Sequence, residues 1–317
     1  MHFFPRVLAL LFLLLTASCS RSCENLQPQI CYSIQDRYLK QLPPPFPPLS
    51  EEEKRAAWGR EYAIGQHFAR DLDLYRAITA FKRASFLLPK EADKRQSEID
   101  YEILLCYYLG RRYEEAEATF RQSGLSQVGP DFPAYRDLLT ILYEVYGKLG
   151  LPEQAAQILE LQKQHDPTIY EGLVLSSALE KADLSALRCW NGESAYSPSL
   201  QQMLHCYDAS KKSPALAQWL NGIIPGTGYL YLGQRQTAMT AFLVNGLFIA
   251  ASVQFFRHGY TAAGIITASF EAGWYFGGIA GARIETTRYN ERMYERCATP
   301  FMNQRGLFPV FMLQYSF

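Results

Sequence analysis

The chain has no excess of charge of either sign. Its 317 residues include 31 basic and 31 acidic side chains, so the formal net charge is zero. A neutral chain creates no field that gathers polyanions, which argues against a nucleic-acid-binding protein. Charge is also nearly absent from one region, because only Arg235, Arg257 and Glu271 are charged between positions 216 and 282. The chain therefore divides into a charged part and an almost uncharged part.

The usual signatures of catalysis and metal binding are missing as well. The sequence contains no C-x-x-C and no G-x-S-x-G, and its 5 histidines do not show the spacing of metal ligands. We therefore expect no enzyme activity, no cofactor and no metal site. A hydrolase without a recognisable motif is the alternative. An aromatic content of 14% argues against disorder.

The first 19 residues predict export. Arg6 precedes an apolar run at 7–15, and small residues follow at 16–18, which is typical of a signal peptide. Cys19 after Ala-Ser resembles the acylated cysteine of bacterial lipoproteins. Thr16 stands where that pattern usually has leucine, so simple cleavage and an uncleaved anchor stay open as alternatives. The resemblance implies a membrane-associated protein of the bacterial cell envelope with a periplasmic repeat domain.

The remaining cysteines suggest disulfides if the chain is exported. We expect the pairs Cys23–Cys31 and Cys189–Cys206, each of which closes a loop. Cys106 falls on an apolar helical stripe, which predicts a core thiol. Spacing alone does not determine connectivity, so other pairings stay open.

Residues 20–57 are predicted to form a linker. The stretch QLPPPFPPLS at 41–50 is rich in proline, which favours an extended polyproline II spacer that holds a domain away from a membrane. Recognition by a proline-binding domain is the alternative. The acidic run at 51–53 then favours the start of a helix.

Apolar and small residues recur at an interval of 39 positions after the linker. The sets are Phe68, Tyr107 and Tyr146; Ala77, Ala116 and Ala155; and Phe81, Phe120 and Leu159. This regularity predicts helix–turn–helix units in which the alanine lets two helices approach closely. Leucines between 173 and 187 suggest a further helix pair that caps the array, so the predicted repeat domain covers 58–212. The fold class predicted is mainly α, an α-solenoid followed by a hydrophobic helical hairpin.

The repeat residues resemble the tetratricopeptide repeat family. The matching positions are Gly65, Phe68, Ala77, Phe81, Ala84 and Pro89 in the first unit, Tyr107, Tyr113, Ala116 and Phe120 in the second, and Tyr146, Ala155, Leu159 and Pro167 in the third. The period is longer than the usual 34 residues of that family, which makes an irregular array the safer expectation. The resemblance implies a groove that binds an envelope protein or peptide.

Residues 213–296 are predicted to form a hydrophobic hairpin. The apolar segments 237–256 and 260–282 are each long enough to span a bilayer, and the polar turn Arg257-His258-Gly259 separates them. Membrane lipid is therefore an expected partner. A hairpin buried in a soluble helical domain is the alternative. Basic residues at 283, 288, 292 and 296 conflict with a periplasmic flank, since such flanks usually stay cytoplasmic.

Polar and small residues mark the inside of this hairpin. Asn245 and Glu271 are expected at similar depth, and we expect them to meet as a structural clasp; an ion or proton relay is the alternative. Gly273, Gly277 and Gly281 recur every four residues, which allows close approach of another helix. The same stripe predicts association of two copies through the hairpin.

A glycine motif precedes the hairpin. It reads P-G-x-G-x-x-Y-x-G and comprises Pro225, Gly226, Gly228, Tyr231 and Gly233. It lacks the lysine of a phosphate-binding loop. With the later Ala238, Phe242, Asn245, Glu271, Gly273-Trp274-Tyr275 and Tyr289-Asn290, it resembles an uncharacterised group of bacterial envelope proteins, although Gly278 stands where asparagine is expected. The resemblance implies membrane association and supplies no catalytic residues.

The tail at 297–317 ends in the alternating sequence LFPVFMLQYSF, which predicts an edge strand or a docking segment. A single strand cannot close a barrel, although the pattern resembles the last strand of one. Together these features predict a membrane-attached helical-repeat adaptor that binds partner proteins in the cell envelope. A small transport or ion-coupled component that uses Glu271 is the second hypothesis.

Overall fold

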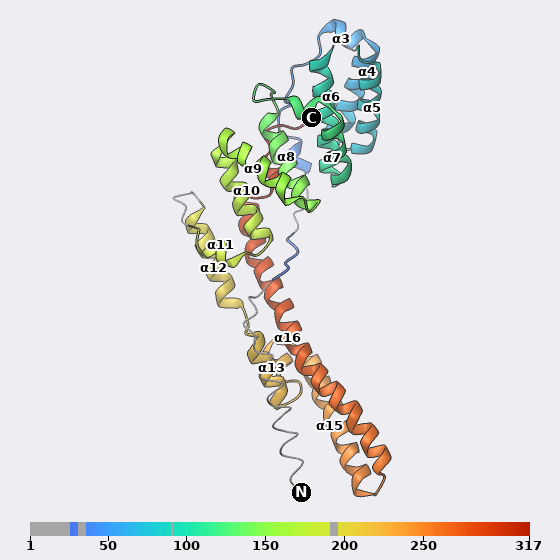
Figure 1. Ribbon diagram of the computed structural model, residues 1–317, viewed down its shortest axis with the longest axis vertical. Helices are drawn as coiled ribbons and strands as arrows, with labels where there is room; N and C mark the ends of the chain where they lie inside the picture. The colour runs from blue at the N-terminus through green and yellow to red at the C-terminus, as the bar shows by residue number, and fades with distance from the viewer. Residues whose placement is uncertain (1–25, 31–35, 90–91, 191–195) are drawn as a thin grey trace. The chain divides into compact units, whose positions relative to one another are not determined.

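The computed structural model describes residues 26–30, 36–89, 92–190 and 196–317 (Figure 1). The fold is mainly α, as predicted, and every regular element in these ranges is helical. The chain divides into unit 1, from Met1–Gln29 and Gln202–Cys297, and unit 2, from Ile30–Gln201 and Ala298–Phe317. Helices α12 (Ser197–Ser210) and α16 (Thr261–Arg305) contribute to both units. The predicted signal peptide, Cys19, Cys23 and Cys31 lie outside the described residues.

Unit 2 contains three helix pairs that follow the 39-residue period. The pairs are α4 (Ala57–Arg70) with α5 (Leu74–Leu87), α6 (Asp93–Leu109) with α7 (Tyr113–Gln122), and α8 (Tyr135–Lys148) with α9 (Pro152–His165). Other elements of unit 2 are α2 (Asp36–Leu39), α3 (Glu51–Arg55), η1 (Gly124–Gln127), α10 (Pro167–Glu180), α11 (Leu184–Arg188) and η2 (Pro309–Met312). The predicted helix–turn–helix units are thus present as helix pairs.

The period arises from the turn inside each pair. Leu72, Arg111 and Gly150 occupy corresponding positions and all have positive φ, at 64°, 56° and 69°. The next N–H bonds back to the carbonyl of the periodic aromatic residue at 2.9 Å in each pair, from Asp73 to Phe68, from Arg112 to Tyr107 and from Leu151 to Tyr146. This pattern is a Schellman motif, which satisfies carbonyls at the helix end and reverses the chain.

We expect Gly150→Ala to destabilise unit 2 by about 1 kcal/mol, because an L-residue is strained at positive φ. A Cβ at Gly150 would meet nothing within 4 Å, so the cost comes from the backbone alone. Gly147→Ala is the matched control, because it also has open space but lies inside α8, where alanine favours the helix. The urea midpoint of unfolding should therefore fall in Gly150→Ala and rise in Gly147→Ala. Equal shifts in the two variants would contradict this explanation of the turn.

Small residues allow the first pair to pack closely, as predicted. Ala77 and Phe81 of α5 are fully buried. A Cβ at Gly65 of α4 would lie 2.6 Å from the Phe81 ring, so glycine is needed for this contact. Helix α6 is buried along its whole second half, from Glu98 to Leu109, and forms the centre of the unit 2 core.

The proline-rich stretch is not the free spacer that the sequence predicts. Phe46 is buried and its ring lies 5.6 Å from that of Tyr101 and 5.4 Å from that of Phe132. Ser50 then forms a capping box with Glu53 at the start of α3, in line with the predicted helix start. The prolines hold an extended segment that presents Phe46 and Leu49 to the core, and this burial makes the stretch part of unit 2.

The tail does not form the strand that its alternation predicts. Pro309–Met312 is a 3-10 helix, and Leu307, Phe308 and Val310 are all buried in unit 2. A 3-10 turn directs nearly consecutive side chains into a core, so alternation along the sequence does not predict its buried residues. The tail is instead docked on unit 2.

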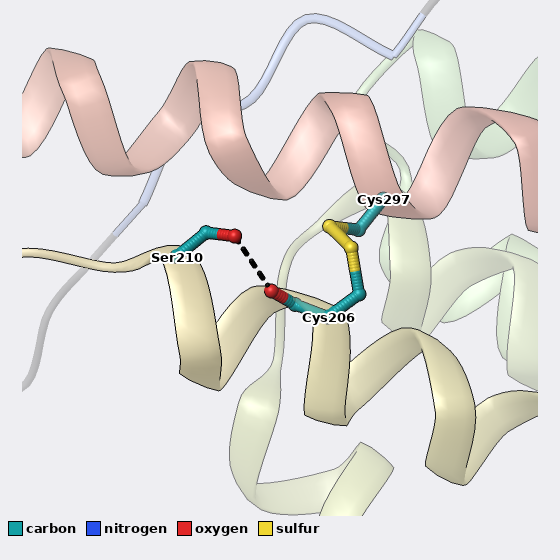
Figure 2. Close-up of a disulfide and its surroundings, with 3 residues drawn as sticks. All are labelled: Cys206, Ser210 and Cys297. Atoms are coloured by element: carbon teal, nitrogen blue, oxygen red, sulfur yellow. Dashed lines mark hydrogen bonds between the residues drawn. A yellow bond between two sulfur atoms is a disulfide. The ribbon is translucent and has the colours of Figure 1, made fainter.

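Unit 1 contains α13 (Pro214–Ile223), α14 (Thr227–Tyr231), α15 (Arg235–Arg257) and the adjoining parts of α12 and α16. A disulfide joins Cys206 of α12 to Cys297 of α16, and Figure 2 shows it bridging the two helices. The predicted Cys189–Cys206 pair is therefore wrong, because Cys206 faces α16; Cys189 is free and exposed. Cys106 is a buried thiol, as predicted.

Candidate functional site: the apolar hairpin and the repeat surfaces

Helices α15 and α16 form an antiparallel pair in unit 1 that turns at Gly259 (Figure 1). A Cβ at Gly264 of α16 would lie 2.7 Å from the Phe256 ring of α15, which shows close packing near the turn. The hairpin predicted from the two apolar segments is therefore present.

The outward faces of this hairpin are apolar and exposed. Leu247 on α15 is 69% exposed and Phe270 on α16 is 68% exposed. Other large apolar residues share these faces: Met239, Phe242, Leu243, Ile249, Val253, Ile265, Ile266, Trp274 and Ile284. A soluble monomer rarely exposes an apolar patch of this extent. Within the described residues, α15 is the one helix long and apolar enough to cross a membrane, so the criterion is not met by the second predicted span in α16.

The inward faces bury polar side chains, several of whose atoms have no hydrogen-bond partner among the described residues. Asn245 is 3% exposed and Glu271 is 8% exposed, and Ser252 is also buried. The Asn245 amide nitrogen donates to the Ala241 carbonyl at 2.6 Å. The Asn245 Oδ1, the Ser252 hydroxyl and both Glu271 oxygens have no hydrogen-bond partner among the described residues. The expected clasp between Asn245 and Glu271 is therefore not formed as a hydrogen bond, since Asn245 bonds within its own helix.

The three stripe glycines differ in what they face. A Cβ at Gly273 or Gly277 would meet nothing within 4 Å, so neither glycine lets a helix of this chain approach. At Gly281 a Cβ would lie 2.6 Å from the Tyr229 hydroxyl oxygen, so this glycine does permit a close contact with α14. Within the chain, only part of the stripe serves the predicted helix packing.

The glycines of the P-G-x-G motif lie where four helices meet. Gly226 has φ +93°, and a Cβ there would overlap the Ala238 carbonyl of α15. A Cβ at Gly228 would overlap the Ala217 carbonyl of α13 and lie 2.9 Å from Cβ of Ala282 on α16. The motif therefore allows α13, α14, α15 and α16 to pack together, which is a structural role.

Asn221 connects this crossing to the departure noted at Gly278. Its Oδ1 accepts the Gly226 N–H at 2.8 Å. Its Nδ2 would lie 3.3 Å from a Cβ at Gly278, so the amide of Asn221 fills the space beside that glycine. A larger residue at 278 would compete with Asn221 for this space.

The remaining motif residues fix the entry to α13. Gly233 has φ +81° and ends α14. The Tyr231 hydroxyl oxygen accepts the Ser213 N–H at 3.2 Å, and the Lys212 ammonium lies 4.9 Å from the Tyr231 ring centre. Asn290 of α16 bonds both backbone groups of Lys212 at 2.8 Å. Tyr231 of α14 and Asn290 of α16 thus both bind the short segment that leads into α13.

Unit 2 has open grooves between neighbouring helices. A groove of about 550 Å³ is lined mainly by residues of α8, α9 and α10, and its lining includes Tyr143, Lys148, Leu151 and Glu180. A groove of about 330 Å³ lies between α5 and α6 and includes Tyr107. The Lys148 ammonium and Glu180 carboxylate form a 2.9 Å ion pair at the first groove.

Unit 2 also buries carboxyl groups that sequence reasoning did not single out. Burial, reinforced by the Glu98 charge, raises the pKa of Glu102 to about 8, although the neighbouring Tyr62 hydroxyl opposes the shift. Burial raises the pKa of Glu144 to about 6, although Tyr108 donates to it at 2.5 Å. Burial likewise raises the pKa of Asp137 to about 6. In the sequence, nothing distinguishes these three carboxyl residues from acidic residues that face solvent.

Among the described residues no group of three or more His, Cys, Asp or Glu side chains is arranged to hold a metal ion. The resemblances to the tetratricopeptide repeat family and to the envelope proteins rest on the motifs given above. Comparison with known proteins found no matching family model, no matching curated protein and no matching solved structure.

Proposed function

We propose that this protein is a membrane-attached helical-repeat adaptor of the bacterial cell envelope. Unit 1 inserts its hairpin into the bilayer, and unit 2 binds a partner protein on the periplasmic side. The observation that supports this most directly is the exposed apolar surface of α15 and α16. Acylation of Cys19 would add a second attachment to the membrane.

The dimensions of the hairpin suit a bilayer. The 23 residues of α15 extend about 34 Å, compared with a hydrocarbon core of about 30 Å. Arg235 and Arg257 stand at the two ends of the helix, where long basic side chains reach the headgroup region. The length of α15 and the positions of its two terminal arginines therefore both match the thickness of one bilayer.

The disulfide supports the periplasmic side for the base of the hairpin. Cys206–Cys297 closes a loop that contains α13, α14 and α15. Disulfides persist in oxidising compartments and are rare in the cytosol. The base of unit 1 therefore suits the periplasm, and the Arg257-His258-Gly259 turn would reach the far face of the membrane.

Membrane insertion is tested by a charge on the exposed face of α15. We expect Leu247→Lys to move a large fraction of the protein from the carbonate-resistant membrane pellet to the soluble fraction, because a lysine at mid-helix costs about 2.5 kcal/mol or more on insertion. The matched control is Phe86→Lys in unit 2, where the native side chain is 89% exposed, and this variant should fractionate as wild type.

The fractionation is repeated with Cys19→Ala and palmitate labelling, so that lipid anchoring and insertion are measured separately. Cys19→Ala should lose the label and stay in the pellet. Wild-type protein that carbonate extracts completely, or a Leu247→Lys variant that behaves as wild type, would contradict insertion of the hairpin.

A transport or ion-coupled component is the second candidate, and the unpartnered oxygens of Glu271 favour it specifically. A carboxyl group in the membrane is costly and often marks an ion or proton path. Glu271→Gln separates the two candidates: an adaptor keeps its partner binding and membrane attachment, whereas an ion-coupled component loses its function.

A further inference from the structure

The last seven residues of the tail are held in unit 2 by their backbone. The Tyr38 hydroxyl lies 2.8 Å from the Phe311 carbonyl oxygen and 3.0 Å from that of Leu313. The Arg136 guanidinium donates to the Met312 carbonyl at 3.2 Å. Side chains of unit 2 thus donate hydrogen bonds to the carbonyl oxygens of three successive tail residues, 311 to 313.

The amides that follow are held in the same way. Oδ2 of the buried Asp137 accepts the N–H groups of Gln314 and Tyr315, each at 2.9 Å. The Ser316 N–H donates to the Pro43 carbonyl at 3.0 Å, and Arg70 donates to the Phe317 carbonyl at 3.4 Å. Every residue from 311 to 317 therefore has a backbone group bonded to unit 2.

This arrangement differs from ordinary packing of a tail. The residues that bond the segment come from separate parts of unit 2, namely α2, α4, α8 and the proline-rich stretch. The bonds address backbone groups, which every peptide carries, so they give affinity with little demand on side chains. Asp137 is a carboxylate buried at this surface, and burial of such a group is costly unless N–H donors compensate it.

Buried side chains of the tail determine which sequences this surface of unit 2 would prefer. Met312 is buried against Gly172 of α10, where an added Cβ would lie 3.2 Å from the Met312 methyl carbon. Phe317 is buried beside Leu39 and Ala69. Gln314 between them is exposed. Leu313 and Ser316 are buried as well, so the surface suits a segment with large apolar residues five positions apart and leaves only the position of Gln314 open to any side chain.

We infer that Tyr38, Arg70, Arg136 and Asp137 form a peptide-binding groove, filled at rest by residues 311–317, which an apolar segment of a partner protein enters by displacing the tail. The inference rests on the proposed adaptor function and names the surface that captures the partner. Gly306, with φ +63°, ends α16 just before the tail.

The test uses the full chain in detergent and a synthetic peptide of residues 307–317. Excess peptide should increase hydrogen exchange of the Gln314 and Tyr315 amides of the chain at least tenfold, because the displaced tail loses its bonds to Asp137. A peptide that is N-methylated at Gln314 and Tyr315 lacks both donors and should have no effect. A Gln314→Ala peptide should act as the native peptide, since that side chain is exposed.

A second arm measures affinity with the labelled peptide and a variant that stops after Gly306. If this variant keeps its helical circular dichroism, it should bind at least tenfold more tightly than the full chain, and N-methylation should abolish binding. If it is unfolded, hydrogen exchange in the full chain decides. Unchanged exchange, or equal effects of native and N-methylated peptides, would overturn the inference, as would tails exchanged in a stable dimer. Carbonate resistance is measured in the same preparations, so loss of the groove and loss of the membrane anchor are told apart.

Discussion

Gly228→Ala should destabilise unit 1 by about 3 kcal/mol, the upper range for overpacking of a well-packed site. The added methyl group would overlap the Ala217 carbonyl and lie 2.9 Å from the Cβ atoms of Ala282 and Asn221. These neighbours are a backbone atom and two Cβ atoms, so none can move by rotating a side chain. The helices must separate to make room.

This effect is measured by heating the detergent-solubilised chain and using proteolysis of unit 1 as the readout of its unfolding. Gly246→Ala on α15 is the matched control, because a Cβ there meets nothing within 4 Å and alanine favours the helix, so this variant should be at least as stable as wild type. Unit 2 should keep its protease resistance in both variants. A Gly228→Ala protein as stable as the control would show that the motif does not act through close helix packing.

The repeats were predictable because one local structure recurs. Phe68, Tyr107 and Tyr146 sit at the same place in each Schellman turn, so a fixed backbone geometry imposes a fixed spacing on the sequence. The position of the left-handed residue itself was hidden, since Leu72 and Arg111 occupy it without the glycine that normally signals it.

The contacts of the tail and the disulfide were not predictable from local patterns. Cys206 and Cys297 are 91 positions apart, and only the path of α16 past α12 brings them together. The tail is held by Tyr38 and Asp137 through its backbone, which leaves no trace in the tail's own side-chain pattern. Long-range contacts of this kind depend on the whole fold, whereas the two apolar segments of the hairpin and the polar turn between them can be read from the local sequence.

Stability of unit 2 should rise as the pH falls from 8 to 6, and Glu102→Gln should abolish this rise. The folded-state pKa of Glu102 is about 8, above its usual 4.5, so the folded state holds a proton that the unfolded state releases. This contribution is fully present below pH 4.5 and is lost as the pH rises through 8. With 1.36 kcal/mol for each pKa unit, the loss amounts to about 2–3 kcal/mol between pH 6 and pH 8.

Urea unfolding at pH 6, 7 and 8, followed by hydrogen exchange of the α6 amides, isolates this effect. The buried amide of Glu102→Gln has the same cost at every pH, so the informative quantity is the slope. Glu144→Gln is the control: the pKa of Glu144 is about 6, so this variant should keep the slope between pH 6 and 8 and lose part of it only below pH 6. A slope that survives in Glu102→Gln would mean that Glu102 does not cause it and is ionised in the folded protein at neutral pH, as a buried charge beside Tyr62.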